Sequence, residues 1–176
     1  ALNEKRGEHP YSLKSQDLEK FLKQTFDRWY EDFMKGDYVS VRYFDNLINI
    51  ILGFRPEACN MNGRCQCQCV IEADGGVYPC DFYVIDKWQL GNIKDKEIED
   101  IISCETAKAF IEISLPVAPE CKECEWYSIC KGGCRRERDS FEEGNMALNY
   151  YCASYKEFLN YAYTRLVKVA RMISRK

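Results

Sequence analysis

The sequence has 176 residues, 46% of them hydrophobic, and a formal net charge of −3. This length suits one domain with a packed core, and the charge argues against a general nucleic-acid binder. No apolar run approaches the roughly 20 residues that span a bilayer. The polar start, Ala1 to Arg6, is unlike a signal peptide, so we expect a cytoplasmic protein with reduced cysteines, no membrane partner and a monomeric state.

The first predicted elements lie between residues 15 and 53. Helical periodicity predicts a helix that begins after Ser15 as N-cap and ends at Gly36. The alternation from Val39 to Phe44 is typical of a short strand, and a second helix is expected to end at Gly53. The first helix carries an apolar face that we expect to pack in the core: Leu18, Phe21, Leu22, Phe26, Trp29, Tyr30 and Phe33.

The middle and end of the chain predict further elements. Residues 69–80 read as a β-hairpin that turns at Asp74 and Gly75. Two short helices are expected at 95–102 and 104–113, before a loop over 116–134 and a final helix after Cys152. The pattern therefore predicts an α+β fold. The apolar residues expected to face inward in these helices are Ile98, Ile101, Ile102, Phe110, Ile113, Tyr155, Phe158, Leu159, Ala162, Leu166, Val169 and Ile173.

The cysteines are the most informative feature of the chain. There are 11 cysteines and a single histidine, His9. Four thiolates close a [4Fe–4S] cluster or a structural zinc site, and eight of the cysteines make two such sets. Disulfides are disfavoured by the odd count and by the expected compartment. The eight run as Cys59-x5-Cys65-x14-Cys80, Cys121-x2-Cys124-x5-Cys130-x3-Cys134 and then Cys152.

Zinc is the rival interpretation of the same residues. The pair Cys121 and Cys124 has the spacing of a zinc knuckle. The other gaps are long and irregular, and no histidine lies near the cysteines, so the ligands of any metal here are sulfur atoms. Cys67, Cys69 and Cys104 are left over, and we interpret Cys69 and Cys104 as small, at least partly buried residues.

Together with other segments, the cysteines make the chain resemble the C-terminal half of an anaerobic sulfatase-maturating enzyme. Such an enzyme is a radical S-adenosylmethionine (SAM) enzyme with a SPASM domain. The resemblance covers nearly the whole chain. It rests on the eight cysteines, on Asp74-Gly75 and on four further segments: Val77-Tyr78-Pro79-Cys80-Asp81-Phe82-Tyr83, Leu90-Gly91-Asn92-Ile93, Cys130-Lys131-Gly132-Gly133-Cys134-Arg135 and Asn149-Tyr150-Tyr151-Cys152.

The resemblance implies three segments. Residues 1–53 would be the end of the radical SAM domain, a partial TIM-type barrel, with bridging helices. Residues 54–152 would be the SPASM domain, and 153–176 a C-terminal helix. The SPASM domain of this family holds two auxiliary [4Fe–4S] clusters. By position, the first takes Cys59, Cys65, Cys80 and Cys134, and the second takes Cys121, Cys124, Cys130 and Cys152.

Asp81 is the catalytic candidate. The resemblance implies that it is the general base for the side chain of a sulfatase cysteine or serine, which the enzyme oxidises to Cα-formylglycine. A carboxylate beside a cluster ligand could lie in a partly desolvated cleft that raises its pKa. Without the resemblance, an aspartate that caps the turn after Cys80 is the simpler interpretation.

The radical-generating machinery is absent from this sequence. A radical SAM enzyme needs a Cys-x3-Cys-x2-Cys motif for the cluster that cleaves SAM, and no such triplet occurs. SAM and that third [4Fe–4S] cluster would belong to the missing half, so we expect this chain alone to be inactive. Two alternatives stay open: a non-catalytic, metal-stapled peptide-binding module, and the SPASM domain of a different peptide-modifying radical SAM enzyme.

Overall fold

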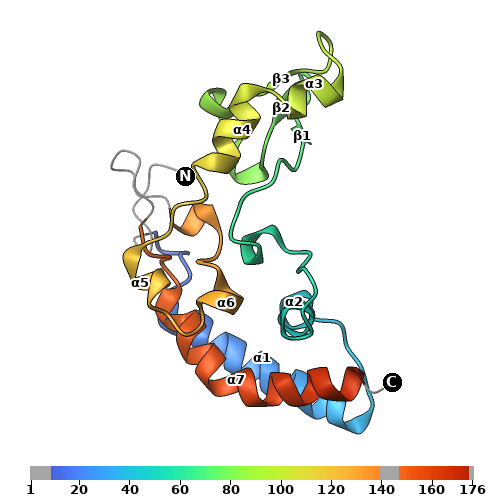
Figure 1. Ribbon diagram of the computed structural model, residues 1–176, viewed down its shortest axis with the longest axis vertical. Helices are drawn as coiled ribbons and strands as arrows, with labels where there is room; N and C mark the ends of the chain where they lie inside the picture. Colours follow the sequence, from blue (N-terminus) through green and yellow to red (C-terminus); the bar gives the residue numbers. More distant parts are fainter. Residues whose placement is uncertain (1–8, 139–146, 175–176) are drawn as a thin grey trace.

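The computed structural model describes residues 9–138 and 147–174, and the ends of the expected segments, 1–8 and 175–176, lie outside them. Two long helices, α1 (Ser15–Lys35) and α7 (Cys152–Ile173), lie side by side at one end of the molecule (Figure 1). Helix α2 (Arg42–Ile51) packs on α7, and a small sheet lies at the opposite end. The cysteine-rich segments run between the two ends. None of the helices in the described part is long and apolar enough to cross a membrane.

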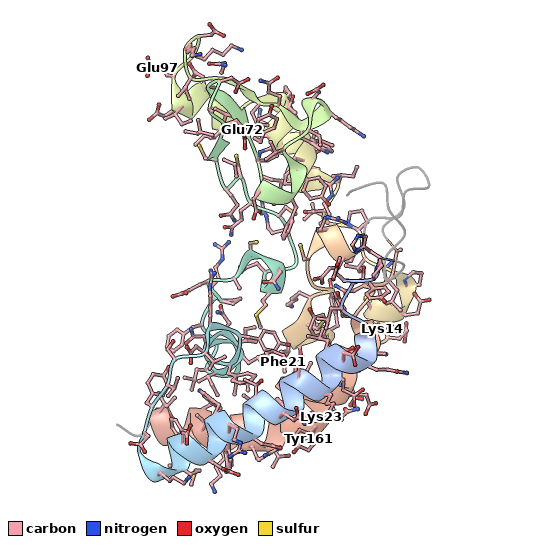
Figure 2. All side chains as sticks on the ribbon, turned by 180° about the vertical axis from the view of Figure 1, so that it is seen from behind. Lys14, Phe21, Lys23, Glu72, Glu97 and Tyr161 are labelled. Carbon is pink, nitrogen blue, oxygen red and sulfur yellow. The ribbon has the colours of Figure 1, made fainter. Side chains whose placement is uncertain are left out.

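Aromatic side chains form the core of the helical end. The Phe26 ring meets Phe44 and Phe158 edge to face, with centroids 5.3 and 5.7 Å apart, a favourable geometry for aromatic pairs. The periodic face predicted for α1 is confirmed at Leu22, Phe26 and Trp29, which are buried. Phe21 is an exception, because 60% of it is exposed. Figure 2 shows Phe21 on α1 and, farther along the helix pair, Lys23, whose Nζ lies over the Tyr161 ring of α7.

Both ends of α1 can be compared with the prediction. The stop at Gly36 is confirmed: its φ is 94°, a conformation that glycine adopts without strain. The predicted N-cap is wrong, because Lys14 is the N-cap and Ser15 is already helical. The hydroxyl of Ser15 instead contacts that of Ser154 on α7. The serine therefore joins the two long helices and does not cap its own.

The strand predicted between Val39 and Phe44 is wrong. Helix α2 begins at Arg42, and residues 38–41 are irregular. The carboxylate of Asp45, in the first turn, accepts hydrogen bonds from the Tyr38 hydroxyl (2.8 Å) and the Ser40 hydroxyl (2.6 Å). These bonds fold the preceding segment back onto the N-terminus of α2, where a negative charge is favourable.

The predicted hairpin is confirmed and gains a third strand. Strands β1 (Val70–Ile71), β2 (Gly76–Tyr78) and β3 (Gly91–Asn92) form an antiparallel sheet in the order β1-β2-β3. Gly75 forms the turn with φ 91°. A side chain at Gly91 would press against Ile101, so its glycine allows α3 to pack closely on the sheet.

The two short helices predicted after the hairpin are confirmed, and they pack against the sheet. They are α3 (Ile98–Ile102) and α4 (Glu105–Glu112), with Ile101 and Phe110 fully buried. Ile102, expected to face inward, is 40% exposed, and so is the distal Ile173 of α7 at 39%. Figure 2 shows Glu72 and Glu97 at this end of the molecule. The mostly helical chain with its small antiparallel sheet confirms the α+β class.

The cysteine-rich segments are short turns and not one open loop. They comprise two four-residue helices, α5 (Pro119–Lys122) and α6 (Tyr127–Cys130), and single 3₁₀ turns. The 3₁₀ turns are η1 (Cys59–Met61), η2 (Asp81–Tyr83), η3 (Asp86–Trp88) and η4 (Arg135–Glu137).

Candidate metal centres

One cavity gathers four cysteines from three distant parts of the chain. It opens to solvent. Asp81, Phe82 and Arg135 also line it. Its cysteines are the four assigned by position to the first cluster: Cys59, Cys65, Cys80 and Cys134.

A second, smaller cavity gathers the other four. It lies between α5, α6 and the start of α7. Trp126, Tyr155 and Leu159 contribute apolar walls. Its cysteines are the four assigned to the second cluster: Cys121, Cys124, Cys130 and Cys152.

The donor sets fit iron–sulfur clusters. Each cavity presents four thiols and no histidine, the ligand set that [4Fe–4S] clusters use. In the described residues, no three His, Cys, Asp or Glu side chains are close enough to hold one metal ion. A [4Fe–4S] cluster spreads its thiolates over four irons, so its ligands lie farther apart than those of a single zinc ion. The ligand assignment itself stays a prediction.

Burial raises the pKa of three of these thiols strongly. It raises the pKa of Cys80 to about 12, and those of Cys130 and Cys134 to about 11. Within the second set, the pKa of Cys130 is raised further by the neighbouring thiols of Cys152, Cys121 and Cys124. Because a bound thiolate has lost its proton, loading either cavity with metal would release protons.

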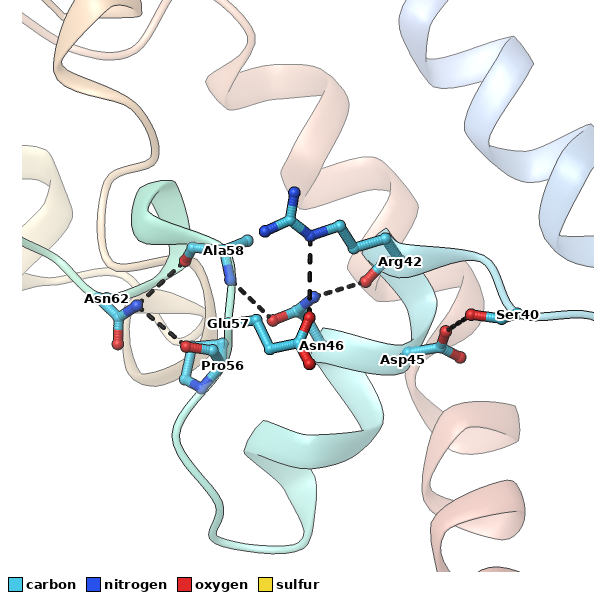
Figure 3. Close-up of polar contacts among 8 residues, drawn as sticks. All are labelled: Ser40, Arg42, Asp45, Asn46, Pro56, Glu57, Ala58 and Asn62. Atoms are coloured by element: carbon cyan, nitrogen blue, oxygen red, sulfur yellow. Dashed lines mark hydrogen bonds and ion pairs between the residues drawn. The ribbon is translucent and has the colours of Figure 1, made fainter. Parts of the chain in front are cut away.

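Polar contacts from α2 fix the approach to Cys59 (Figure 3). Asn46 is buried, and its Oδ1 accepts a hydrogen bond from the amide of Ala58, 3.1 Å away. Its Nδ2 donates to the Arg42 carbonyl, at 2.7 Å. On the other side of Ala58, the Asn62 side chain donates to the carbonyls of Pro56 and Ala58. The turn that presents Cys59 is thereby tied to the helical core.

A glycine pair shapes the chain between Cys130 and Cys134. Gly132 and Gly133 have φ of 83° and 73°. The side-chain amide of Asn149 donates to the Gly132 carbonyl and to the Glu137 carboxylate, and a Cβ at Gly133 would collide with that amide. The close approach requires glycine here, and both Gly132 and Asn149 line the second cavity.

An arginine follows Cys134 and is enclosed by aromatic rings. The guanidinium carbon of Arg135 lies 4.6 Å from the Tyr83 ring centroid, 4.9 Å from Trp88 and 4.7 Å from Phe110. Cation–π attraction in this buried place stabilises the packing of η4 against η2, η3 and α4. Its charge also opposes the burial that raises the pKa of Cys65.

Asp81 lies on the rim of the first cavity. Asp81 is exposed, whereas the sequence analysis suggests that it lies in a partly desolvated cleft. Oδ1 accepts hydrogen bonds from the Cys80 thiol at 3.3 Å and from the Phe82 amide at 3.1 Å. The amide contact is of the kind a turn cap makes, and the position beside the cavity suits a base, so the geometry is compatible with both roles.

The three remaining cysteines lie outside both cavities. Cys67, Cys69 and Cys104 are partly buried and pack against the Val77 cluster beneath the sheet. Cys104 caps α4, since its sulfur accepts a hydrogen bond from the Ala107 amide. The predicted burial of Cys69 and Cys104 is confirmed.

Sequence reasoning missed the polar residues that support the sites. Asn46, Ser114, Arg138 and Asn149 are all at most 5% exposed. Asn149 lies in a segment that carries the family resemblance, and an asparagine three residues before a predicted ligand was a usable signal. Ser114 and Arg138 have no local pattern that distinguishes them from surface residues.

Comparison with known proteins supports the resemblance that the sequence shows. A family model described as SPASM, an iron–sulfur cluster-binding domain, matches residues 59–125. The chain is 55% identical over 172 residues to a cysteine-type anaerobic sulfatase-maturating enzyme of Clostridium perfringens, covering 98% of this chain and 46% of that protein. The chain is thus similar to the SPASM-containing part of the anaerobic sulfatase-maturating enzymes.

Two further relatives agree with this similarity. A cysteine-type enzyme of Clostridium novyi is 43% identical over 173 residues, with 98% of this chain and 46% of that protein covered. A serine-type enzyme of Bacteroides thetaiotaomicron is 28% identical over 153 residues, covering 86% and 36%. The chain therefore spans about half the length, or less, of the curated relatives that it matches.

A solved structure matches the fold. Native anSMEcpe with bound AdoMet and Cp18Cys peptide superposes with a TM-score of 0.93 at 54% identity, covering 97% of this chain and 47% of that one. The same protein with bound AdoMet alone gives a TM-score of 0.92 at 54% identity, covering 96% and 46%.

Proposed function

We propose that this chain is the auxiliary iron–sulfur domain of a radical SAM enzyme that oxidises a cysteine or serine of a sulfatase to Cα-formylglycine. It would supply two [4Fe–4S] sites, substrate positioning and the general base. The observation that carries the proposal is the sorting of eight cysteines into two separate cavities of four, one with a carboxylate on its rim.

The ligand sets would interleave along the chain. Cys59, Cys65, Cys80 and Cys134 would hold the first cluster, and Cys121, Cys124, Cys130 and Cys152 the second. Cys134 thus returns past three ligands of the second cluster to complete the first. When bound, the clusters would accept or pass on electrons. They would also fasten the hairpin end to the helical end, because both ends contribute ligands.

Asp81 would hold the proton-accepting position. An exposed carboxylate beside the first cavity can reach a peptide side chain that lies over the cavity mouth, and its Oδ1 is fixed by the Phe82 amide. Exposed Phe82 would give the peptide an apolar contact next to that base. The part of the relatives that this chain does not span would cover the mouth, exclude water and bring SAM.

The identities favour a cysteine target. The two cysteine-type relatives described above are 55% and 43% identical to the chain, whereas the serine-type relative is 28% identical. We therefore propose an unfolded or nascent segment of a cysteine-type sulfatase as the partner, met in the cytoplasm by a monomeric enzyme.

Metal and sulfide analysis tests the iron–sulfur part of the proposal. After anaerobic reconstitution with iron and sulfide, the chain should hold about eight irons and as many acid-labile sulfides, with visible absorbance of iron–sulfur clusters. Two equivalents of zinc without labile sulfide would instead indicate a zinc-stapled module.

Activity tests the sulfatase part. The chain alone should produce no 5′-deoxyadenosine from SAM, because it lacks the Cys-x3-Cys-x2-Cys motif. The enzyme with its SAM-binding part restored should convert a cysteine-containing sulfatase peptide to the formylglycine product. Loaded clusters with no product from that peptide would favour a different peptide substrate.

A further inference from the structure

Arg138 is a buried cation between the two cysteine sets. It is 2% exposed, and its partners are backbone carbonyls. Nη1 donates to the Pro116 carbonyl at 2.8 Å, and Nη2 to the Ser114 carbonyl at 2.9 Å. Nε is buried and has no hydrogen-bond partner. Across residues 9–138 and 147–174, no carboxylate forms an ion pair with this guanidinium.

A charge in such a place is costly. Arginine stays protonated in proteins, and removing its charge from water requires compensation by opposite charge or by a complete set of hydrogen bonds. The two carbonyls satisfy only part of the guanidinium and carry no net charge. The sequence nevertheless places an arginine here, and the clusters that the cavities would hold are a source of compensating negative charge.

Short contacts join Arg138 to both cavities. On one side, Ser114 accepts the Cys65 amide hydrogen bond with its hydroxyl at 2.8 Å and receives Arg138 on its carbonyl. On the other side, a Cβ built on Gly132, which lines the second cavity, would lie 3.6 Å from Cδ and 3.8 Å from Nη1 of Arg138. The guanidinium is therefore one residue away from each cavity wall.

Arg135 has a narrower reach than Arg138. It lines the first cavity and is not among the residues that line the second. The two arginines therefore differ in which cavities they approach, and this difference supplies a matched control.

We propose that Arg138 is a positioning residue shared by both cluster sites, whose fixed positive charge makes both clusters easier to reduce. The inference rests on the proposed function, because it requires the two clusters. A [4Fe–4S] cluster with four thiolates is anionic and gains a further negative charge on reduction, so a nearby cation favours the reduced form. One side chain would then adjust the electron affinity of both sites together.

Redox titration of the reconstituted chain, followed by EPR, tests the proposal. In Arg138→Gln, the ratio of reduced to oxidised cluster at fixed potential should fall about tenfold for both clusters, equal to 59 mV for a one-electron couple. Arg138→Lys keeps the charge and should stay close to wild type. Arg135→Gln should shift the first cluster and leave the second unchanged. Cys121→Ala, which removes a ligand of the second site, assigns the signals.

Each outcome decides between electrostatics and structure. If Arg138→Gln loses clusters while Arg138→Lys retains them, the charge is needed for assembly, which supports the proposal. Equal shifts or equal losses in both variants would overturn it, because the shape of the side chain would then matter and not its charge. A shift at one cluster, or at neither, would also overturn it. Wild-type protein that fails to load two clusters would refute the proposed function instead.

Discussion

The hydroxyl of Ser114 accepts a hydrogen bond from the backbone amide of Cys65, 2.8 Å away, and itself donates to the carbonyl of Ile111. Ser114 follows α4 and is fully buried, so this contact ties the Cys65 turn to the helix that covers the sheet. A cysteine expected to bind metal is thus held through its backbone where it lines the first cavity.

Ser114→Ala should lower the free energy of unfolding by about 1–3 kcal/mol, because it strands the Cys65 amide without a partner. Ser103→Ala is the matched control: Ser103 is exposed and also bonds a carbonyl of its own helix, so its loss should change stability by less than about 0.5 kcal/mol. Denaturant unfolding of both variants measures the difference. Equal losses of unfolding free energy in the two variants would show that the hydrogen bond to the Cys65 amide adds no stability of its own.

Gly133→Ala should destabilise the chain more than Gly53→Ala. Both glycines have positive φ, so both substitutions carry the roughly 1–2 kcal/mol of a left-handed residue. A Cβ at Gly53 meets nothing within 4 Å, whereas at Gly133 it collides with the Asn149 amide. Thermal unfolding separates the two effects. Gly133→Ala no worse than Gly53→Ala would mean that Asn149 moves aside without cost.

Cys121→Ala should reduce the iron content of the reconstituted chain from about eight to about four, because the proposed sets share no ligand. Cys104→Ala, outside both cavities, should keep about eight. Iron and sulfide analysis with EPR checks the counts. Retention of both clusters in Cys121→Ala would contradict the assignment, and so would loss of iron from Cys104→Ala.

Asp81→Asn should leave the clusters and SAM cleavage intact in the enzyme with its SAM-binding part restored. Formylglycine production should fall by about 10²–10⁴-fold, the usual contribution of a positioned base. Mass spectrometry of the peptide product measures it. Wild-type product would identify Asp81 as a turn cap through its Phe82 contact. Loss of iron would instead assign it a role in supporting Cys80.

Asp27 should make the α1–α7 contact sensitive to acid. Partial burial acts to raise the pKa of Asp27, but hydrogen bonds from Tyr161 and Arg165 outweigh it, so the pKa is lowered below 3.8. A carboxylate with a lowered folded pKa adds stability above its unfolded pKa, and this is lost as pH falls through the folded value. Below about pH 4, the free energy of unfolding should therefore depend less steeply on pH in Asp27→Asn than in the wild type.

Arg165→Gln provides the partner measurement. It removes the 2.8 Å contact between Arg165 Nη1 and Asp27 and should flatten the same acid limb, less completely because Tyr161 remains. At neutral pH the pair is partly exposed, so a modest effect is expected. If the free energy of unfolding falls with pH in both variants as it does in the wild type, other carboxylates control acid unfolding.

Local patterns were sufficient for much of the fold. The hairpin was predictable because Asp74-Gly75 is a strong turn signal, and α1 and α7 because their apolar periodicity is long. The strand prediction from Val39 to Phe44 was wrong because six residues do not distinguish the period of a strand from that of a helix when a helix begins within them. Strand β3 was missed because two residues carry no period, and it exists only through its pairing with β2.

The candidate sites divide in the same way. The eight cysteines were identifiable from count, order and family resemblance, and the structure places each set of four around one cavity. Ser114 and Arg138 were not predictable, because their importance depends on carbonyls and amides brought near by the fold. The exposure of Asp81 was also beyond the sequence, since it depends on which segments surround the cavity.

The interleaved cysteine order affects how the protein can mature on the ribosome. Synthesis proceeds from the N-terminus, so the first set becomes complete when Cys134 emerges, and the second only when the opening residue of α7, Cys152, follows. When Cys134 emerges, α7 is still inside the exit tunnel, and α1 lacks its partner helix. On the proposed ligand sets, the second cluster could be fully ligated only at the same stage of synthesis that allows the two long helices to pair.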